Sequence, residues 1–413
     1  MDPKFSRRTA LSMGGAGATL AATGALAQTF GNPDRPPEGA INATPEAESI
    51  QGPKNKPLSH LFPDAESPPP TDVGGVPRFW SSFEIASRRI QAGGWARQVT
   101  QDDFPASTEV SGVNMRLAAG GIRELHWHNA GEWAIMTYGH CRVTVLDQDG
   151  RLWIGDVEEG DLWFFPAGFP HSLQGLGPDG CEFVIVFDSG EASEFDTTLV
   201  TDWFAHTPPE VLAQNFNLPP EAFKNVPLND LWIFQGKIAG SVGLDQSEDN
   251  PFIFQLSRSQ PHVENSAGVI HLADSTNFKM STTIAAALER LKPGAMRELH
   301  WHPNADEWQY WIKGHGRVGI FGAGPKASTM DFGPGDLALV KRNYGHYVLN
   351  TGDEDVIFLA VFRAPRYMEV SLAEWIARLP HDLVTQHLNI PEADLKKIAM
   401  QRQEIVPKRQ HAK

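Results

Sequence analysis

One hexapeptide, Arg-Glu-Leu-His-Trp-His, occurs twice in this chain of 413 residues, at positions 123–128 and 297–302. The occurrences are 174 residues apart (297 − 123), and matching residues continue on both sides at nearly the same spacing. The further matched pairs are Phe104/Phe278, Glu132/Glu307, Gly139/Gly314, Gly160-Asp161/Gly335-Asp336, His171/His346, Trp203/Trp375, Pro208/Pro380 and Pro219/Pro391. This collinear series indicates an internal duplication. Because solenoid repeats have periods of only about 20–50 residues, each copy is expected to be a whole domain.

Both copies contain short runs rich in β-branched and aromatic residues, separated by Gly, Pro and Asp, and such runs predict strands. The expected strands are 133–138, 142–146, 162–165 and 183–187 in the first copy, and 308–312, 317–321, 337–340 and 356–362 in the second. Short strands at this spacing favour an all-β sandwich or barrel. Helices are expected only after each barrel, at 208–215 and 372–379.

The composition fits a turn-rich β protein and excludes several other classes. The chain has 38 Gly and 31 Pro, and 41% of its residues are hydrophobic, so it is neither collagen-like nor wholly disordered. A formal net charge of −15 argues against a nucleic-acid partner. Two cysteines cannot form a disulfide scaffold, and we expect Cys141 and Cys181 to be buried free thiols.

The first 27 residues are typical of a secretory signal peptide. Lys4, Arg7 and Arg8 precede an uncharged stretch that ends in the A-x-A cleavage site 25–27. Residues 6–11 resemble a twin-arginine signal, so we expect a periplasmic or secreted protein with no membrane attachment after cleavage. Because this segment carries a net charge of +2, counting Asp2, its removal would change the net charge from −15 to −17.

The remaining sequence divides into four parts. Residues 28–75 are rich in Pro and are expected to form an arm or linker. The two barrels are expected to span 76–240 and 241–400, and the basic residues 401–413 are expected to form a frayed tail.

Each copy carries three histidines and one glutamate at metal-ligand spacing. His126 and His128 are separated by one residue, so in a strand both point to the same face. Glu132 follows after a turn at 129–131, and His171 follows the turn at 166–168. The second copy repeats this order with His300, His302, Glu307 and His346. Two complete sets predict two metal sites for a divalent transition metal. Mixed N/O ligation is compatible with Mn²⁺ or Fe²⁺, whereas affinity order alone favours Cu²⁺ or Zn²⁺.

These residues resemble the two motifs of the cupin superfamily. The first motif is Gly120-x5-His126-x-His128-x3-Glu132-x6-Gly139, and the second is Gly160-x5-Pro166-Ala-Gly168-x2-His171. The second copy matches through Gly294, Gly314, Gly335 and its four ligands, with Lys341 and Asn343 in place of the usual Pro and Gly. The resemblance implies a bicupin, two jelly-roll barrels in one chain.

Residues 76–400 are similar to bacterial and fungal oxalate decarboxylases. The shared segments are the two hexapeptides, 273–278, 307–310 and 345–347. This resemblance implies cleavage of oxalate to formate and CO2, with two Mn²⁺ per chain and O2 to cycle the metal. It also implies a homo-oligomer, a trimer or hexamer.

The same resemblance suggests roles for residues beyond the metal ligands. Arg123 is expected beside the first metal, where its planar guanidinium can hold a substrate carboxylate, and Arg297 is its counterpart at the second. Glu194 aligns with the lid glutamate that donates a proton, although Phe195 and Asp196 depart from the usual lid sequence. The second copy has Ala360 where some bacterial members have a glutamate. We expect Tyr367 to border the second site, and Trp127 and Trp301 to pack between the barrels.

Three alternatives remain open at this stage. An oxalate oxidase would convert oxalate and O2 into CO2 and hydrogen peroxide. A non-enzymatic storage bicupin often lacks ligands, whereas both sets are complete here. A bicupin dioxygenase would act on a larger aromatic substrate, whereas the paired arginines favour a small dicarboxylate.

Overall fold

The computed structural model describes residues 51–240, 250–324 and 326–409. The predicted signal peptide, residues 1–27, lies outside these ranges, as does the first part of the predicted arm. Within the described ranges, no helix is both long enough and apolar enough to cross a bilayer.

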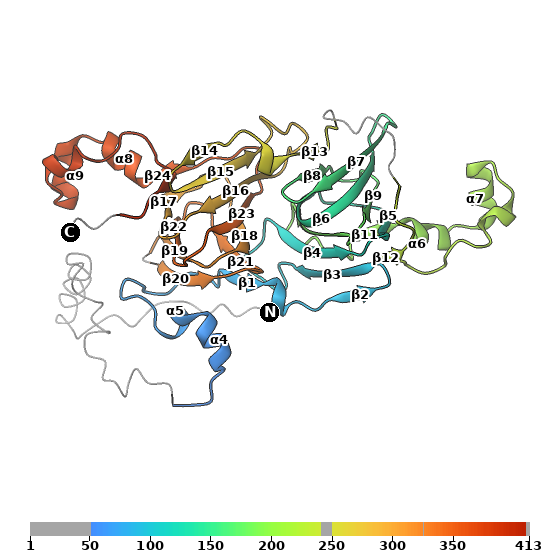
Figure 1. Ribbon diagram of the computed structural model, residues 1–413, viewed down its shortest axis with the longest axis horizontal. Helices are drawn as coiled ribbons and strands as arrows, with labels where there is room; N and C mark the ends of the chain where they lie inside the picture. Colours follow the sequence, from blue (N-terminus) through green and yellow to red (C-terminus); the bar gives the residue numbers. More distant parts are fainter. Residues whose placement is uncertain (1–50, 241–249, 325, 410–413) are drawn as a thin grey trace, which may run out of the picture.

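The chain forms two β-barrels that lie side by side, as the duplication predicted (Figure 1). The strands of the first copy are β2 (Arg89–Gln91), β3 (Gly94–Val99), β4 (Ser111–Leu117), β5 (Gly121–His128), β6 (Glu132–Leu146), β7 (Leu152–Glu158), β8 (Leu162–Phe165), β9 (His171–Gly175), β10 (Cys181–Phe187), β11 (Thr197–Leu199) and β12 (Ile233–Gln235). The strands of the second copy are β14 (Val263–Asn265), β15 (Gly268–Ala273), β16 (Ala285–Leu291), β17 (Met296–Trp301), β18 (Glu307–Lys313), β19 (Gly316–Gly322), β20 (Lys326–Phe332), β21 (Asp336–Val340), β22 (Gly345–Asn350), β23 (Val356–Phe362), β24 (Val370–Ser371) and β25 (Ile405–Val406).

One predicted pair of strands is a single strand in the structure. The segments 133–138 and 142–146 both lie in β6, which pairs first with β8 and β10 and then with β7 and β9. Gly139 has a φ of +72°, and the register of β6 against β10 shifts nearby. This bulge lets one strand turn from one sheet into the other.

Short helices follow each barrel and project at opposite ends of the molecule (Figure 1). They are α6 (Val200–Ala205), α7 (Pro209–Phe216) and η2 (Pro220–Phe223) after the first barrel, and α8 (Leu372–Arg378), α9 (His381–Leu388) and α10 (Glu392–Leu395) after the second. The predicted helices 208–215 and 372–379 correspond to α7 and α8. The other helical turns are α4 (Lys56–Leu61), α5 (Pro63–Glu66), η1 (Phe83–Ile85) and η3 (Leu256–Arg258).

Two short strands connect the copies, because each pairs with a strand of the other copy. The strand β1 (Trp80–Ser82) pairs with β21 of the second copy, although residues 76–240 were assigned to the first. The strand β13 (Ile253–Phe254) pairs with β8 of the first copy. Each crossing strand covers an edge that would otherwise expose unpaired backbone groups.

Both ends of the described chain are fixed to the second barrel. In the predicted arm, Asp64 forms an ion pair with Arg317 at 2.9 Å, and the Thr329 amide donates to Asp72 at 2.7 Å. The expectation of a frayed tail is wrong for residues 402–406. The strand β25 pairs with β17, because Ile405 is an apolar residue that becomes buried there, and Glu404 is buried beside it.

The two barrels share an apolar interface in addition to their own interiors. Its buried side chains include Trp133 and Val184 from the first copy and Trp308 and Leu359 from the second. Trp308 is 1% exposed, and its ring lies so close to Gly112 that a Cβ there would be 2.8 Å from Trp308 Cζ2. This packing joins the copies into one unit.

We therefore expect Trp308→Ala to destabilise the protein by about 3–5 kcal/mol, because it leaves a cavity between the barrels. Denaturant unfolding measures this change. Leu228→Ala serves as the control, since Leu228 is 79% exposed, and should change the stability by less than about 0.5 kcal/mol. Equal effects of the two substitutions would contradict the assigned interface.

Candidate metal centres

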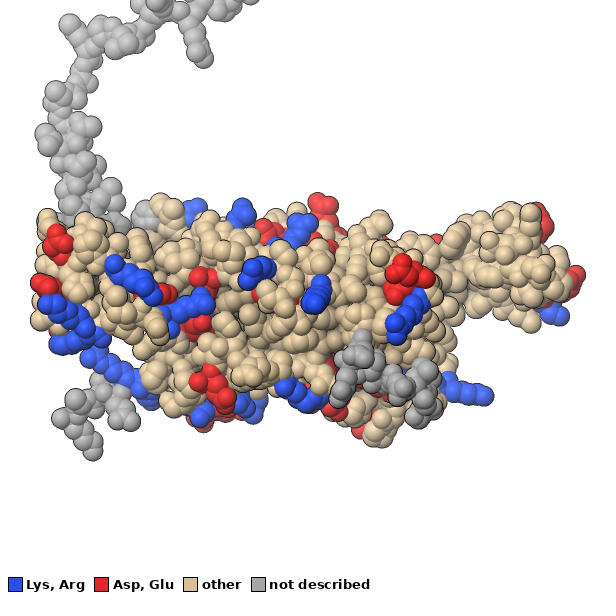
Figure 2. Space-filling model, turned by 90° about the horizontal axis from the view of Figure 1, so that it is seen from above, with Lys and Arg blue, Asp and Glu red and all other residues tan. Residues whose placement is uncertain are grey.

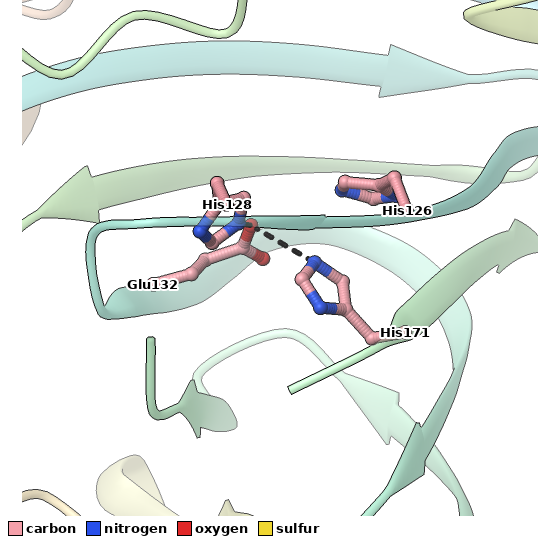
Figure 3. A group of neighbouring side chains, drawn as sticks. All are labelled: His126, His128, Glu132 and His171. Atoms are coloured by element: carbon pink, nitrogen blue, oxygen red, sulfur yellow. Dashed lines mark hydrogen bonds and ion pairs between the residues drawn. The ribbon is translucent and has the colours of Figure 1, made fainter. Parts of the chain in front are cut away.

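The four predicted ligands of the first copy meet inside the first barrel. His126 and His128 lie on β5, Glu132 begins β6, and His171 begins β9 (Figure 3). All four side chains are buried, and one ligand atom of each lies within 4.8 Å of the others. His128 Nε2 is 3.1 Å from Glu132 Oε2, and His171 Nε2 is 3.5 Å from the same oxygen.

The second copy builds the same arrangement from matching strands. His300 and His302 lie on or just after β17, Glu307 begins β18, and His346 lies on β22. These four ligand atoms also lie within 4.8 Å of one another and are buried. Asn343 replaces the glycine of the turn before His346 but keeps its left-handed backbone, with a φ of +66° against +81° at Gly168. Asn tolerates this conformation, so the departure from the motif leaves the ligand in place.

Backbone carbonyl groups orient all six imidazole rings. Each Nδ1 lies 2.6–3.1 Å from a carbonyl oxygen, which can only accept a hydrogen bond. The carbonyls belong to Glu124, Ala130 and Phe169 in the first copy, and to Glu298, Met368 and Tyr344 in the second. The proton is therefore on Nδ1, and the lone pair of Nε2 is available to a metal.

The ionisation states of the ligands also suit a cation. Burial alone would raise the pKa of Glu132, but His171 and His128 hold that pKa well below its usual range. Burial would also raise the pKa of Glu307, but His346 and His302 hold that pKa well below its usual range. Burial lowers the pKa of His126, of His171 and of His300, which favours neutral imidazoles.

These residues fit a divalent metal ion at both centres. Each centre has three imidazole nitrogen donors and one carboxylate, and His171 Nε2 and His302 Nε2 are buried without a hydrogen-bond partner. An ion would satisfy these orphaned atoms, and no competing cationic side chain forms an ion pair with Glu132 or Glu307 in the described part of the chain.

A bulge brings Arg123 to the same side of β5 as the ligands. Arg123 is three positions before His126, and in a regular strand the two side chains would point to opposite faces. The register of β5 against β9 shifts between these two residues, and β17 shifts in the same way between Arg297 and His300. Both arginines therefore lie on the side of the strand that carries the histidines, and Arg297 Nη2 is 3.5 Å from His300 Nε2.

Arg123 is buried but keeps most of its hydrogen-bonding capacity. Among the described residues, its side chain makes one hydrogen bond, from Nη1 to the Trp232 carbonyl at 3.4 Å, and no ion pair within 4 Å. Its guanidinium lies over the Trp232 ring, 5.1 Å from the centroid. Burial lowers the pKa of Arg123 to about 10, so the group remains charged at neutral pH and can receive an anion.

Arg297 differs from Arg123, because internal acceptors occupy its guanidinium. Nε is 2.7 Å from Glu289 Oε2, Nη2 is 2.6 Å from Glu369 Oε2, and Nη1 donates to the Glu404 carbonyl at 2.7 Å. Tyr367 borders this centre as predicted and accepts a hydrogen bond from Nη2. Arg297 was expected to contact the substrate, but its guanidinium is occupied by ion pairs that the sequence did not reveal.

The candidate proton donor Glu194 is only 3% exposed. Its carboxylate forms an ion pair with Arg89 of β2, a residue that the sequence analysis missed. The Glu194 amide donates to Gln98 Oε1 at 3.0 Å, and Thr197 Oγ1 donates to the Glu194 carbonyl at 2.8 Å. Glu194 is therefore buried and held by two hydrogen bonds of its own backbone, and it interacts electrostatically with Arg123.

Arg89 and Arg123 stack on the same aromatic ring. The Arg89 guanidinium lies 4.7 Å from the Trp232 centroid, and the lid residue Phe195 packs edge-on against Trp232 at 5.5 Å. Trp232 therefore contacts both Arg123 and the arginine that pairs with Glu194.

Cys141 and Cys181 are buried free thiols, as predicted.

Trp127 and Trp301 do not pack between the barrels. They pack against Trp203 of α6 and Trp375 of α8, with ring centroids 5.6 and 6.0 Å apart, because their side chains point outward from the ligand strands.

Replacing one ligand should remove one metal ion and leave the other. We expect His346→Asn to reduce the metal content from two ions per chain to one, as measured by elemental analysis of the purified protein. His206→Ala, at an exposed histidine on the helical segment after the first barrel, should keep two. An unchanged content in His346→Asn would count against the second centre.

Comparisons with known proteins agree with this geometry. The sequence profile of the cupin family matches residues 81–224 and 254–395. The chain is 46% identical to oxalate decarboxylase OxdC of Bacillus subtilis over 348 residues, which cover 83% of this chain and 90% of that protein. It is 36% identical to a probable oxalate decarboxylase of Arthroderma benhamiae, over 90% of this chain and 95% of the other.

Solved structures give the same result. A structure of Bacillus subtilis oxalate decarboxylase, a protein with Mn(II) centres, superimposes with a TM-score of 0.84 at 44% identity and covers 87% of this chain and 97% of the other. With two cupin domains, two sets of three histidines and one glutamate, and this degree of identity, the chain belongs to the bicupin oxalate decarboxylase family.

Proposed function

We propose that this protein catalyses the Mn²⁺-dependent, O2-requiring cleavage of oxalate into formate and CO2. The observation that carries the proposal is the first centre, where a complete ligand set, an arginine free to bind an anion and a buried carboxyl group occur together. In the reaction the C–C bond breaks, one carbon leaves as CO2, and the other gains a proton.

A bound Mn²⁺ would polarise one carboxylate of oxalate and, cycled by O2, provide a radical route that avoids a free carbanion. Arg123 would bind the substrate carboxylate and stabilise negative charge in a site from which water is largely excluded. Its preference for a planar, bidentate partner suits a small dicarboxylate.

Glu194 would supply the proton to the formyl carbon. The ion pair with Arg89 holds the carboxylate in its buried position. Before each transfer the carboxylate would have to take a proton from solvent, when the lid is open. The lid segment is held at one end by Gln98 and at the other by the pairing of β11 with β5. Movement between these two anchors would admit oxalate and release formate.

Glu194→Gln tests this role. A glutamine keeps the shape of the side chain but cannot donate the required proton, so we expect formate production to fall by about 10²–10⁴-fold with two metal ions retained. Glu191→Gln, at an exposed carboxylate just before the lid segment, should behave like the native enzyme. Near-normal formate production by Glu194→Gln would refute the assignment.

Arg89 should act as a positioning residue for Glu194. We expect Arg89→Met to leave the metal content unchanged and to reduce kcat roughly tenfold, since a change of about 1.4 kcal/mol in the lid equilibrium has this effect. KM for oxalate should change less, because Arg123 remains. The neighbouring exposed Arg88→Met is the matched control. A rise in KM with an unchanged kcat would place Arg89 in substrate binding instead.

The oxalate oxidase reaction is the second candidate, and it is favoured by the exposed lid residues Phe195 and Asp196, which depart from the usual lid sequence. It would convert oxalate, O2 and two protons into two CO2 and hydrogen peroxide. Measuring formate and peroxide per oxalate consumed distinguishes the two reactions. One formate per oxalate supports the decarboxylase, and one peroxide per oxalate supports the oxidase.

We also propose a homo-oligomer, a trimer or hexamer. Each helical segment that projects from the barrels carries exposed large apolar side chains, which are Trp203, Phe216 and Leu218 on the first and Trp375, Leu383 and Leu388 on the second. Such residues at opposite ends of the molecule favour contact with other copies. Light scattering that gives a monomer at micromolar concentration would refute this.

Export by the twin-arginine route remains a further proposal, supported by Arg7, Arg8 and the cleavage site 25–27. The mature protein should begin at Gln28. Replacing both arginines with lysine should retain the precursor inside the cell, and normal export of that variant would refute the route.

A further inference from the structure

Three matched positions around the two arginines carry neutral residues in the first copy and glutamates in the second. They are Met115, Thr197 and Trp232 in the first copy and Glu289, Glu369 and Glu404 in the second. Because the duplicated barrels share their ligands and their arginine, these positions distinguish the surroundings of the two arginines.

Strand register establishes the matches. Met115 on β4 lies opposite Phe183, and Glu289 on β16 lies opposite the matching Phe358. The strands β11 and β24 pair with the ligand strands through Thr198↔Trp127 and Val370↔Trp301, so Thr197 and Glu369 are the preceding residues in each copy.

The third pair occupies the same unusual backbone position. Trp232 and Glu404 precede β12 and β25, have φ values of +54° and +52°, and each gives its carbonyl to the nearby arginine. The carbonyls also accept the amides of Glu124 and Glu298, at 3.0 and 2.9 Å.

The exchange changes what each arginine can bind. In the first copy the positions matched to Glu289 and Glu369 hold the apolar Met115 and Thr197, whose hydroxyl donates to the Glu194 carbonyl, and neither side chain carries a negative charge. Arg123 itself lies over the ring of Trp232. At Arg297, Glu369 and Glu289 contact two different nitrogens, and the third nitrogen is bonded to the Glu404 carbonyl. An incoming carboxylate would have to displace a buried partner from Arg297, whereas at Arg123 it meets unused donors.

Glu404 adds negative charge on the outer side of this network. Its carboxylate is 5% exposed at the side chain and lies 3.1 Å from Arg402 Nε and 3.3 Å from His262 Nε2. The strand β25 that carries it lies along β17, so the C-terminal segment closes the barrel beside the second centre.

We infer that the residues at these three matched positions determine which metal centre accepts an anionic substrate. This inference rests on the proposed function for the identity of the anion. It identifies Glu289 and Glu369 as specificity-determining residues of the second centre.

Binding to the cobalt form of the full-length protein tests the inference without turnover. Co²⁺ replaces the native metal, elemental analysis checks for two ions per chain, and equilibrium dialysis with labelled oxalate counts the bound anions. We expect one oxalate per chain for the native sequence. The variant Glu289→Met/Glu369→Thr gives the second copy the residues of the first, and we expect two oxalates per chain.

The reciprocal variant is Met115→Glu/Thr197→Glu, which should retain two cobalt ions and bind no oxalate. The variant Glu289→Met/Glu369→Thr leaves a buried arginine without its partners. If that variant does not fold, the reciprocal variant still tests the inference. Glu264→Gln removes a carboxylate from the exposed strand β14 and should still bind one oxalate.

Two oxalates bound to the native protein would overturn this inference and leave the proposed function intact. Unchanged binding by the reciprocal variant would also overturn it. If the native protein binds none, both the inference and the proposed function fail.

Discussion

The hydrogen bond from each imidazole Nδ1 to a backbone carbonyl is the constraint on which both centres depend. A buried histidine without a fixed partner could present either nitrogen, or could be protonated, and would not form a reliable metal site. Here the accepting carbonyl lies two residues away in sequence for five of the six histidines, so the strand or turn itself orients the ring. The exception is His302, which uses the Met368 carbonyl just before β24. The jelly-roll backbone therefore acts as the outer shell of the site, which explains how the duplication could conserve both ligand sets while other residues diverged.

The repeated residues could be predicted from the sequence because their physical requirements are local. Short-range geometry accounts for the H-x-H pair on one strand face, for the glycines at turns with positive φ and for the runs of strand residues. The repeat made these signals specific, since the same four ligands recur in the same order. The outward glutamate of each hexapeptide has a clear role only in the structure. Glu124 binds Thr201 and Glu298 binds Ser371, so each fixes the segment after its barrel to the ligand strand.

The residues that distinguish the two centres could not be predicted in this way, because they come from distant segments. Glu289, Glu369 and Glu404 lie on three different elements, and only folding brings them around Arg297. The sequence indicated that Ala360 removes a carboxylate from the second centre, but Ala360 lies opposite Ala287, two residues before Glu289 on the same face of β16. A neighbouring strand thus supplies the carboxylate. Arg89 was missed for the same reason, since nothing near it in sequence points to the lid.

The local charge at each centre also resolves the apparent conflict between an acidic protein and an anionic substrate. Charges of both signs are interspersed on the face seen in Figure 2, and surface charges are screened beyond about 8–10 Å. At the first centre a divalent ion, Arg123 and Arg89 would bring four positive charges against two negative charges from Glu132 and Glu194. At the second, the ion, Arg297 and Arg402 bring four against three from Glu307, Glu369 and Glu404. Burial raises the pKa of Glu289 to about 8, so it contributes a fourth negative charge above that pH and occupies Arg297 Nε in either state. A dianion is therefore attracted most strongly to the first barrel, however acidic the remaining surface is, because the decisive charges are the buried ones within a few ångströms of the metal.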